Sequence, residues 1–147
     1  MASDSPRVTL TLPTDLRMLS VARAFVEAVC QAHGLDKSST HAFVLATAEA
    51  VSNIIRHAHR YRPEAQFQIE CRFSSDTFEV AFLDEGDPFD LSAVPQLDPT
   101  ELRVGGRGVY LMRALMDELT CQPRGERGNT LRMVKRRKAA AAVRECG

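Results

Sequence analysis

The sequence predicts a single α+β domain, a two-layer α/β sandwich with helices on one face of a mixed, mainly antiparallel sheet. Its 147 residues, 44% hydrophobic and 26% charged, suffice for one hydrophobic core. The expected elements follow in the order strand, helix, helix, strand, strand, long loop, helix, strand, strand. Because strands do not alternate with helices, a doubly wound parallel sheet is disfavoured.

One strand and two helices are expected in the N-terminal half. Residues 7–12 (RVTLTL) alternate apolar and polar side chains, which is typical of a strand, and Pro13 ends it. Thr14 is the expected N-cap of the first helix, and Gly34 is a plausible C-cap. A second helix should run from about residue 36 to residue 59, because its apolar positions have helical spacing.

Two hairpins and a third helix are expected in the C-terminal half. Residues 84–105 form a long loop with three prolines between the hairpins. Loops of this length are usually functional lids or disordered segments. The third helix should begin at residues 105–108. The hairpin strands are expected at 65–73, 77–83, 119–122 and 130–135.

Composition and charge exclude several classes of protein. The 19 basic and 19 acidic residues cancel, whereas proteins that coat nucleic acid are usually strongly basic. No apolar run is long enough to span a bilayer, and no secretory leader is apparent. The four cysteines form no CxxC pair, so zinc binding has little support and reduced thiols are expected. We therefore expect a cytoplasmic protein with no direct nucleic-acid or membrane partner.

The helix at 36–59 carries polar residues at helical spacing. Glu49 and Asn53 are four positions apart, on one helix face, and His57 extends the stripe by another turn. The carboxylate could accept a hydroxyl proton, and the amide oxygen is a ligand that suits Mg²⁺. A polar outer face of an amphipathic helix would have the same pattern, so this motif alone does not decide the function.

A second motif follows the apolar strand at 77–83. Asp84 stands at the strand end, where its carboxylate could accept hydrogen bonds from an exocyclic amine such as that of adenine. Gly86 lacks a Cβ and would let a flat ring approach the backbone. An ordinary turn is the alternative, because Asp and Gly are turn residues.

Glycines surround Arg107 at the start of the third helix. Free N–H groups at a helix N-terminus suit a phosphate, and a guanidinium adds further donors. The segment Gly105-Gly106-Arg107-Gly108 is not a P-loop, because no Gly-Lys-Ser/Thr follows. A hinge with a helix cap is the alternative. A fourth motif, Gly128-Asn129-Thr130, is weak alone, because most such triplets are hairpin turns.

Together the four motifs are more specific, and the chain resembles the GHKL-type (Bergerat-fold, histidine-kinase-like) ATP-binding proteins. Within them it is most similar to the bacterial anti-sigma factor serine kinases. Many superfamily members have a second glycine in Asp-x-Gly-x-Gly where this chain has Pro88, a departure that fits the anti-sigma subgroup. The segments that carry the resemblance are AEAVSNIIRHAH (48–59), DEGDPFD (84–90), GGRGVYLMRALMDEL (105–119) and GNTLRM (128–133).

The resemblance implies a role for each motif, with ATP and Mg²⁺ as cofactors. Glu49 would be the general base that takes the proton from a substrate serine, and Asn53 would hold the Mg²⁺ that bridges the ATP phosphates. Asp84 would read the adenine amine, with Gly86 giving access and Thr130 supporting the contact.

The remaining site residues are expected to position phosphates or a partner. His57 is assigned only to positioning near the site. Arg23 falls where related kinases place a partner-contacting arginine, and a solvated basic residue is the alternative. The residues implied to wrap the phosphates are Gly105, Gly106, Arg107 and Gly108.

The implied function is that of a protein-serine kinase and anti-sigma factor. It would bind a sigma factor and phosphorylate a STAS-type anti-anti-sigma protein, and it would form a homodimer through the sheet edge near residues 7–12. The kinase domain would span residues 1–136, followed by a basic, solvated tail at 137–147. The alternatives are an ATP-sensing binding module and a stressosome-type switch kinase without sigma binding. Glu49 favours an active kinase, since a pure binder needs no base.

Overall fold

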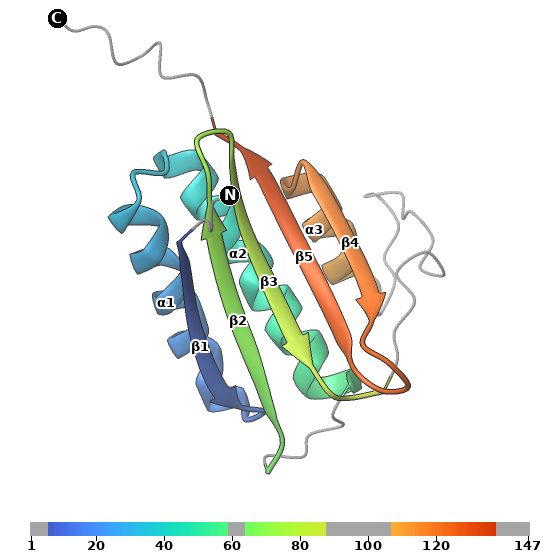
Figure 1. Ribbon diagram of the computed structural model, residues 1–147. Coiled ribbons are helices and arrows are strands. Elements are labelled where there is room, and N and C mark those ends of the chain that lie inside the picture. Colours follow the sequence, from blue (N-terminus) through green and yellow to red (C-terminus); the bar gives the residue numbers. More distant parts are fainter. Residues whose placement is uncertain (1–5, 59–63, 88–106, 138–147) are drawn as a thin grey trace, which may run out of the picture.

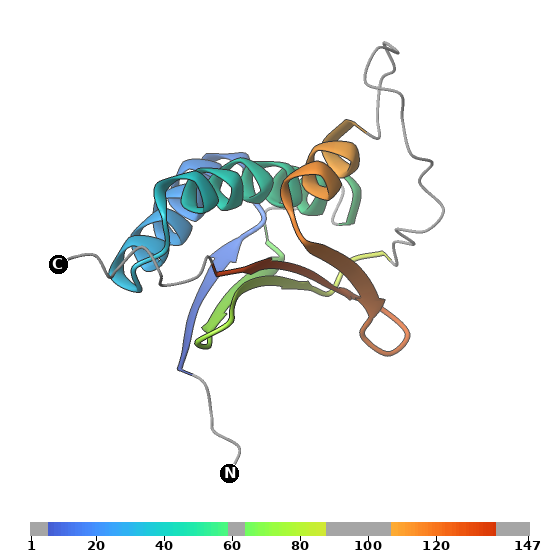
Figure 2. The same ribbon diagram turned by 90° about the horizontal axis from the view of Figure 1, so that it is seen from above.

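The computed structural model describes residues 6–58, 64–87 and 107–137, and their elements form two layers (Figures 1 and 2). A five-stranded sheet in the order β1-β2-β3-β5-β4 makes one layer. Figure 2 shows the helices on one face of this sheet, which confirms the expected sandwich. The strands are β1 (Arg7–Pro13), β2 (Gln66–Phe73), β3 (Thr77–Asp84), β4 (Glu118–Pro123) and β5 (Asn129–Arg136).

The second layer consists of α1 (Leu19–Ala32), α2 (Lys37–Asn53) and α3 (Arg107–Leu115). A short 3₁₀ turn, η1 (Leu16–Met18), precedes α1, and a π-helical turn, η2 (Ile54–Ala58), follows α2. The helices pack on the sheet because their apolar faces meet the inward side chains of the strands. The largest fully buried side chains include Phe43, Phe67, Phe78, Phe82, Ile69 and Met133.

The cap expected at Thr14 is wrong. Asp15 is the N-cap of η1, where its side chain accepts a hydrogen bond from the Arg17 N–H. Thr14 is buried instead, and both its N–H and its hydroxyl donate to the Ala65 carbonyl, at 2.9 and 3.2 Å. Its polar groups are therefore used to tie the end of β1 to the start of β2. The C-cap of α1 is His33, and Gly34 follows it with φ +75°, the left-handed conformation of a glycine that ends a helix.

The second helix does not continue as an α-helix to residue 59. The α-helix ends at Asn53, and Ile54–Ala58 form a π-helical turn, an irregularity that is frequent at functional sites. Because a π-helix bonds residue i to i+5, a spacing of four no longer completes a turn. The stripe that we extended from Asn53 to His57 on α-helical spacing is therefore interrupted. The side chain of His57 lies outside the described residues.

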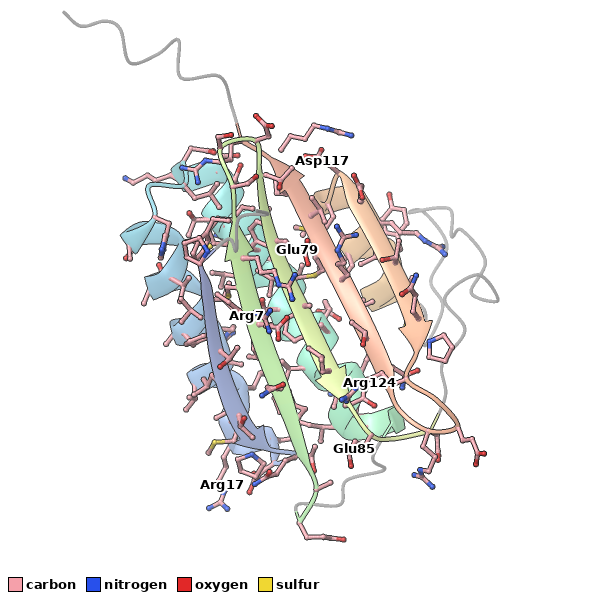
Figure 3. All side chains as sticks on the ribbon, in the orientation of Figure 1. Arg7, Arg17, Glu79, Glu85, Asp117 and Arg124 are labelled. Carbon is pink, nitrogen blue, oxygen red and sulfur yellow. The ribbon has the colours of Figure 1, made fainter. Side chains whose placement is uncertain are left out.

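All four strand pairs are antiparallel. The parallel pair that a mixed sheet would contain is absent from the described strands. The sheet face away from the helices carries charged side chains that pair across strands, including Arg7–Glu70 at 3.5 Å and Arg132–Glu79 at 3.0 Å. Figure 3 looks onto this face. Half-exposed pairs of this kind contribute little to stability.

Arg137, which we assigned to the tail, belongs to the folded domain. Its N–H donates to the Asp76 carbonyl at 2.7 Å, and its guanidinium donates to the His33 carbonyl at 3.0 Å. The rest of the expected tail, residues 138–147, lies outside the described residues. No helix within the described part of the chain is long and apolar enough to span a membrane.

Candidate functional site

Glu49 and Asn53 lie on the C-terminal half of α2. Asp36 caps this helix by accepting a hydrogen bond from the Ser39 N–H, at 3.0 Å. Ala46, Ala50 and other small or apolar residues of α2 are fully buried, whereas Glu49 and Asn53 are half-buried at its side. Their spacing of four puts a carboxylate and an amide on one face of a rigid helix, one turn apart.

The first turn of α3 lies directly against Glu49. A Cβ built at Gly108 would be 2.5 Å from the Glu49 Oε1 atom, closer than real Cβ contacts allow. Only glycine therefore fits at this position without a shift of the carboxylate. The first N–H groups of a helix have no partner within the helix, so this end carries a partial positive charge. The Glu49 carboxylate lies near this end of α3.

Asp84 is a buried carboxylate at the end of β3. It is 3% exposed, and its side chain lies on the helix-facing side of the sheet with Phe82 and Val80. Its Oδ1 atom accepts hydrogen bonds from the Gly86 N–H at 2.8 Å and from the Asn129 amide at 3.1 Å. A buried charge is costly unless it is hydrogen-bonded, and these donors offset that cost.

Asn129, to which the sequence motifs assigned no role, occupies the place that we had given to Thr130. In the register of β3 and β5, Asp84 is opposite Asn129, and Leu83 is opposite Thr130. Successive side chains of a strand point to opposite faces, so Thr130 lies on the face away from Asp84, and the support expected from it is wrong. Leu131 and Met133, which alternate with Asn129 on the buried face, were the signal that could have revealed it.

The hairpin between β4 and β5 holds the backbone of the Asp84 turn. Arg124 donates to the Asp84 carbonyl at 3.0 Å, and the Gly128 N–H donates to the Gly86 carbonyl at 2.8 Å. Gly128 has φ +100°, and a Cβ there would be 2.6 Å from the Asp84 carbonyl oxygen. Figure 3 shows Arg124 beside Glu85 at this end of the sheet.

The two halves of the site lie at the same end of the domain. In Figures 1 and 2 the end of α2, with η2, lies beside the end of β3. Gly105 and Gly106 lie outside the described residues, and Arg107 begins α3 but its side chain is not described. Arg23 is exposed on α1.

The residues of the site fit a magnesium nucleotide. The buried Asp84 carboxylate is an acceptor of the kind that an adenine amine requires, and the Glu49 carboxylate occupies the space that a Cβ at Gly108 would fill. Within the described residues no three His, Cys, Asp or Glu side chains cluster as metal ligands. Mg²⁺ characteristically binds through one or two protein ligands plus substrate phosphates, so an isolated Asn53 is compatible with it.

Sequence comparison decides the family. The family model for the histidine kinase-like ATPase domain matches residues 12–135. The chain belongs to this family. The GHKL-type fold expected from the sequence motifs is therefore confirmed.

Relatives of this ATPase domain include serine-protein kinases. The serine-protein kinase RsbW of Listeria innocua is 28% identical over 127 residues, which is 81% of each chain. The RsbW of Bacillus subtilis is 28% identical over 143 residues, covering 92% of this chain and 88% of the relative.

Two solved structures share the fold of the ATPase domain. A chain of the SiaB–SiaC complex from Pseudomonas aeruginosa matches with a TM-score of 0.67 at 14% identity, over 86% of this chain and 88% of that one. The structure of the RsbU and RsbW domains of Rv1364c from Mycobacterium tuberculosis matches with a TM-score of 0.65 at 17% identity, over 92% of this chain and 33% of that one.

Proposed function

We propose that this ATPase domain is a protein-serine kinase and anti-sigma factor. It transfers the γ-phosphoryl group of ATP to a serine of a STAS-type antagonist, and it binds a sigma factor when the antagonist is phosphorylated. The observation that carries the kinase activity is the Glu49 carboxylate, held against the first turn of α3 and one helical turn from Asn53. Relatives named serine-protein kinase RsbW support the same activity.

Glu49 is the general base in this proposal. The serine oxygen attacks the γ-phosphorus in line, the bond from phosphorus to the leaving oxygen of ADP breaks, and the serine proton moves to Glu49. Phosphoryl transfer depends mainly on positioning and charge neutralisation, so a carboxylate of ordinary strength suffices when it lies within hydrogen-bond distance of the hydroxyl. The close packing of Gly108 against Glu49 supports such positioning.

Asn53 is the proposed protein ligand of Mg²⁺, together with phosphate oxygens. When bound, Mg²⁺ neutralises the charge that develops on the transferring phosphoryl group. The Asp84 carboxylate accepts a hydrogen bond from the amino group of adenine, and Gly86 lets the adenine ring approach the turn. The backbone of Gly105, Gly106 and Gly108 with the Arg107 guanidinium wraps the phosphates, and His57 helps to position the site.

The proposed partners bind in alternation. Arg23 contacts one of them, for which its exposure on α1 is suitable. A homodimer forms through β1, which is an edge strand of the sheet and offers unpaired backbone groups. Phosphorylation of the antagonist releases it and leaves the kinase surface to the sigma factor.

The decisive experiment measures transfer of labelled phosphate from ATP to a purified STAS protein encoded beside this chain. Glu49→Ala should lower the transfer rate by about 10²–10⁴-fold while ATP binding is retained. Glu118→Gln changes an exposed carboxylate on the sheet face away from the helices. This control variant should transfer phosphate at the rate of the parent chain. If the Glu49→Ala variant transfers phosphate as fast as the parent chain, the base assignment fails. If the parent chain binds ATP but transfers nothing, the domain is an ATP-sensing binding module.

A further inference from the structure

The amide group of Asn129 bridges both ends of the turn that follows β3. Its Nδ2 atom donates to the Asp84 Oδ1 atom at 3.1 Å and to the Asp87 carbonyl at 2.9 Å. Asn129 and Asp84 are each 3% exposed, so water does not readily replace either bond. The Asn129 side chain therefore joins the Asp84 carboxylate to the far end of the turn.

Two hydrogen bonds to Asp84 also fix the orientation of its carboxylate. Its Oδ1 atom takes a hydrogen from Asn129 and another from the Gly86 N–H. Two donors directed at one carboxylate oxygen fix the orientation of the group, and a carboxylate accepts hydrogen bonds and donates none. A fixed acceptor suits the amino group of adenine. It repels the carbonyl oxygen that guanine and hypoxanthine carry at the same ring position.

We propose that Asn129 is a positioning residue that determines the preference of this site for adenine over 6-oxopurines. The inference rests on the proposed function, because it assumes that Asp84 reads the base. Asn129 acts through Asp84, because its hydrogen bond to Oδ1 holds the carboxylate in place.

The hairpin between β4 and β5 makes this arrangement rigid. Gly128, the neighbour of Asn129, donates to the Gly86 carbonyl, and Arg124 donates to the Asp84 carbonyl. The backbone of the turn is therefore held independently of the Asn129 side chain. Removal of that side chain should disturb the carboxylate more than the turn, so the specificity can be tested in a folded protein.

The test compares the affinities of the full chain for MgATP and MgITP by titration calorimetry. ITP differs from ATP by a carbonyl oxygen in place of the amino group, so it lacks the contact that Asn129 supports. Asn129→Ala should lower the affinity for ATP about tenfold, as expected for a lost hydrogen bond to a charged group, and leave that for ITP within about twofold. Asn129→Thr keeps a donor and should restore most of the preference.

Gln122→Ala is the matched control, since it removes an exposed amide from the neighbouring strand opposite Thr130. It should change neither affinity. If Asn129→Ala lowers both affinities by the same factor, or neither, Asn129 has only a structural role and the inference is overturned. Asp84→Asn tests the adenine contact of Asp84 separately from the role of Asn129. If this variant has the same ratio of ATP affinity to ITP affinity as the parent chain, the adenine assignment itself is wrong.

Discussion

Glu49 and Gly108 are 59 positions apart in the sequence, yet no side chain can begin at residue 108 while the Glu49 carboxylate keeps its place. A Cβ at Gly108 would be 2.5 Å from Oε1 and 3.5 Å from the Cβ of Glu49. The carboxylate of the proposed base thus occupies the space that a side chain at residue 108 would need.

Gly108→Ala should therefore slow phosphoryl transfer by displacing Glu49, and Glu49→Asp should slow it by retracting the carboxylate. Because the shorter side chain makes room for the added methyl group, the double variant should lose less than the product of the two single effects. Transfer rates in a double-mutant cycle measure this coupling. Effects that simply multiply would show that the contact does not position the base.

Asn53→Ala should remove the part of the ATP affinity that depends on Mg²⁺. ATP binding in EDTA should be the same for the variant and the parent chain, whereas added Mg²⁺ should strengthen binding about tenfold less in the variant. Titration calorimetry with and without the metal measures both values. Ser52→Ala, at the neighbouring half-buried position of α2, should behave as the parent chain. If Mg²⁺ strengthens ATP binding equally in Asn53→Ala and in the parent chain, Asn53 is not a ligand of the metal.

Gly128→Ala should destabilise the domain more than Gly125→Ala, although both glycines have positive φ. At Gly125 no atom lies within 4 Å of an added Cβ, so the cost is backbone strain alone, about 1 kcal/mol. At Gly128 the added Cβ also meets the Asp84 carbonyl oxygen at 2.6 Å. Urea unfolding of the two variants measures the difference, and equal midpoints would contradict the close approach.

Cys30 and Cys71 should make the domain less stable at high pH. Burial raises the pKa of each thiol from 9.0 to about 12. The folded state thus keeps thiol protons that the unfolded state releases. The contribution of the two thiols to the free energy of unfolding is therefore complete below pH 9, and it is lost as the pH rises from 9 toward 12. Urea unfolding between pH 8 and about pH 10 should show this fall, and Cys71→Ala should reduce its slope. A stability that is flat over this range in the parent chain would exclude the linkage.

The elements that the sequence predicted well are those with a local pattern. Alternating side chains in residues 7–12 and 66–73, and turn residues in both hairpins, placed the strands close to their observed bounds. Local patterns failed at two places, where the helix geometry changes and where a residue bonds to a distant segment. The change to a π-turn after Asn53 has no signal in apolar spacing, and Thr14 resembles a cap although it bonds to Ala65, 51 positions away.

The sequence by itself determined which residues are available for chemistry: a carboxylate and an amide on one helix, an acidic residue at a strand end, and glycines at a helix start. These follow from spacing along the chain. Only the tertiary structure decided which of them meet, because strand register and helix packing depend on contacts between distant segments. One step of register gives Asp84 the amide of Asn129 rather than the hydroxyl of Thr130, and the packing of α3 on α2 places Gly108 at Glu49.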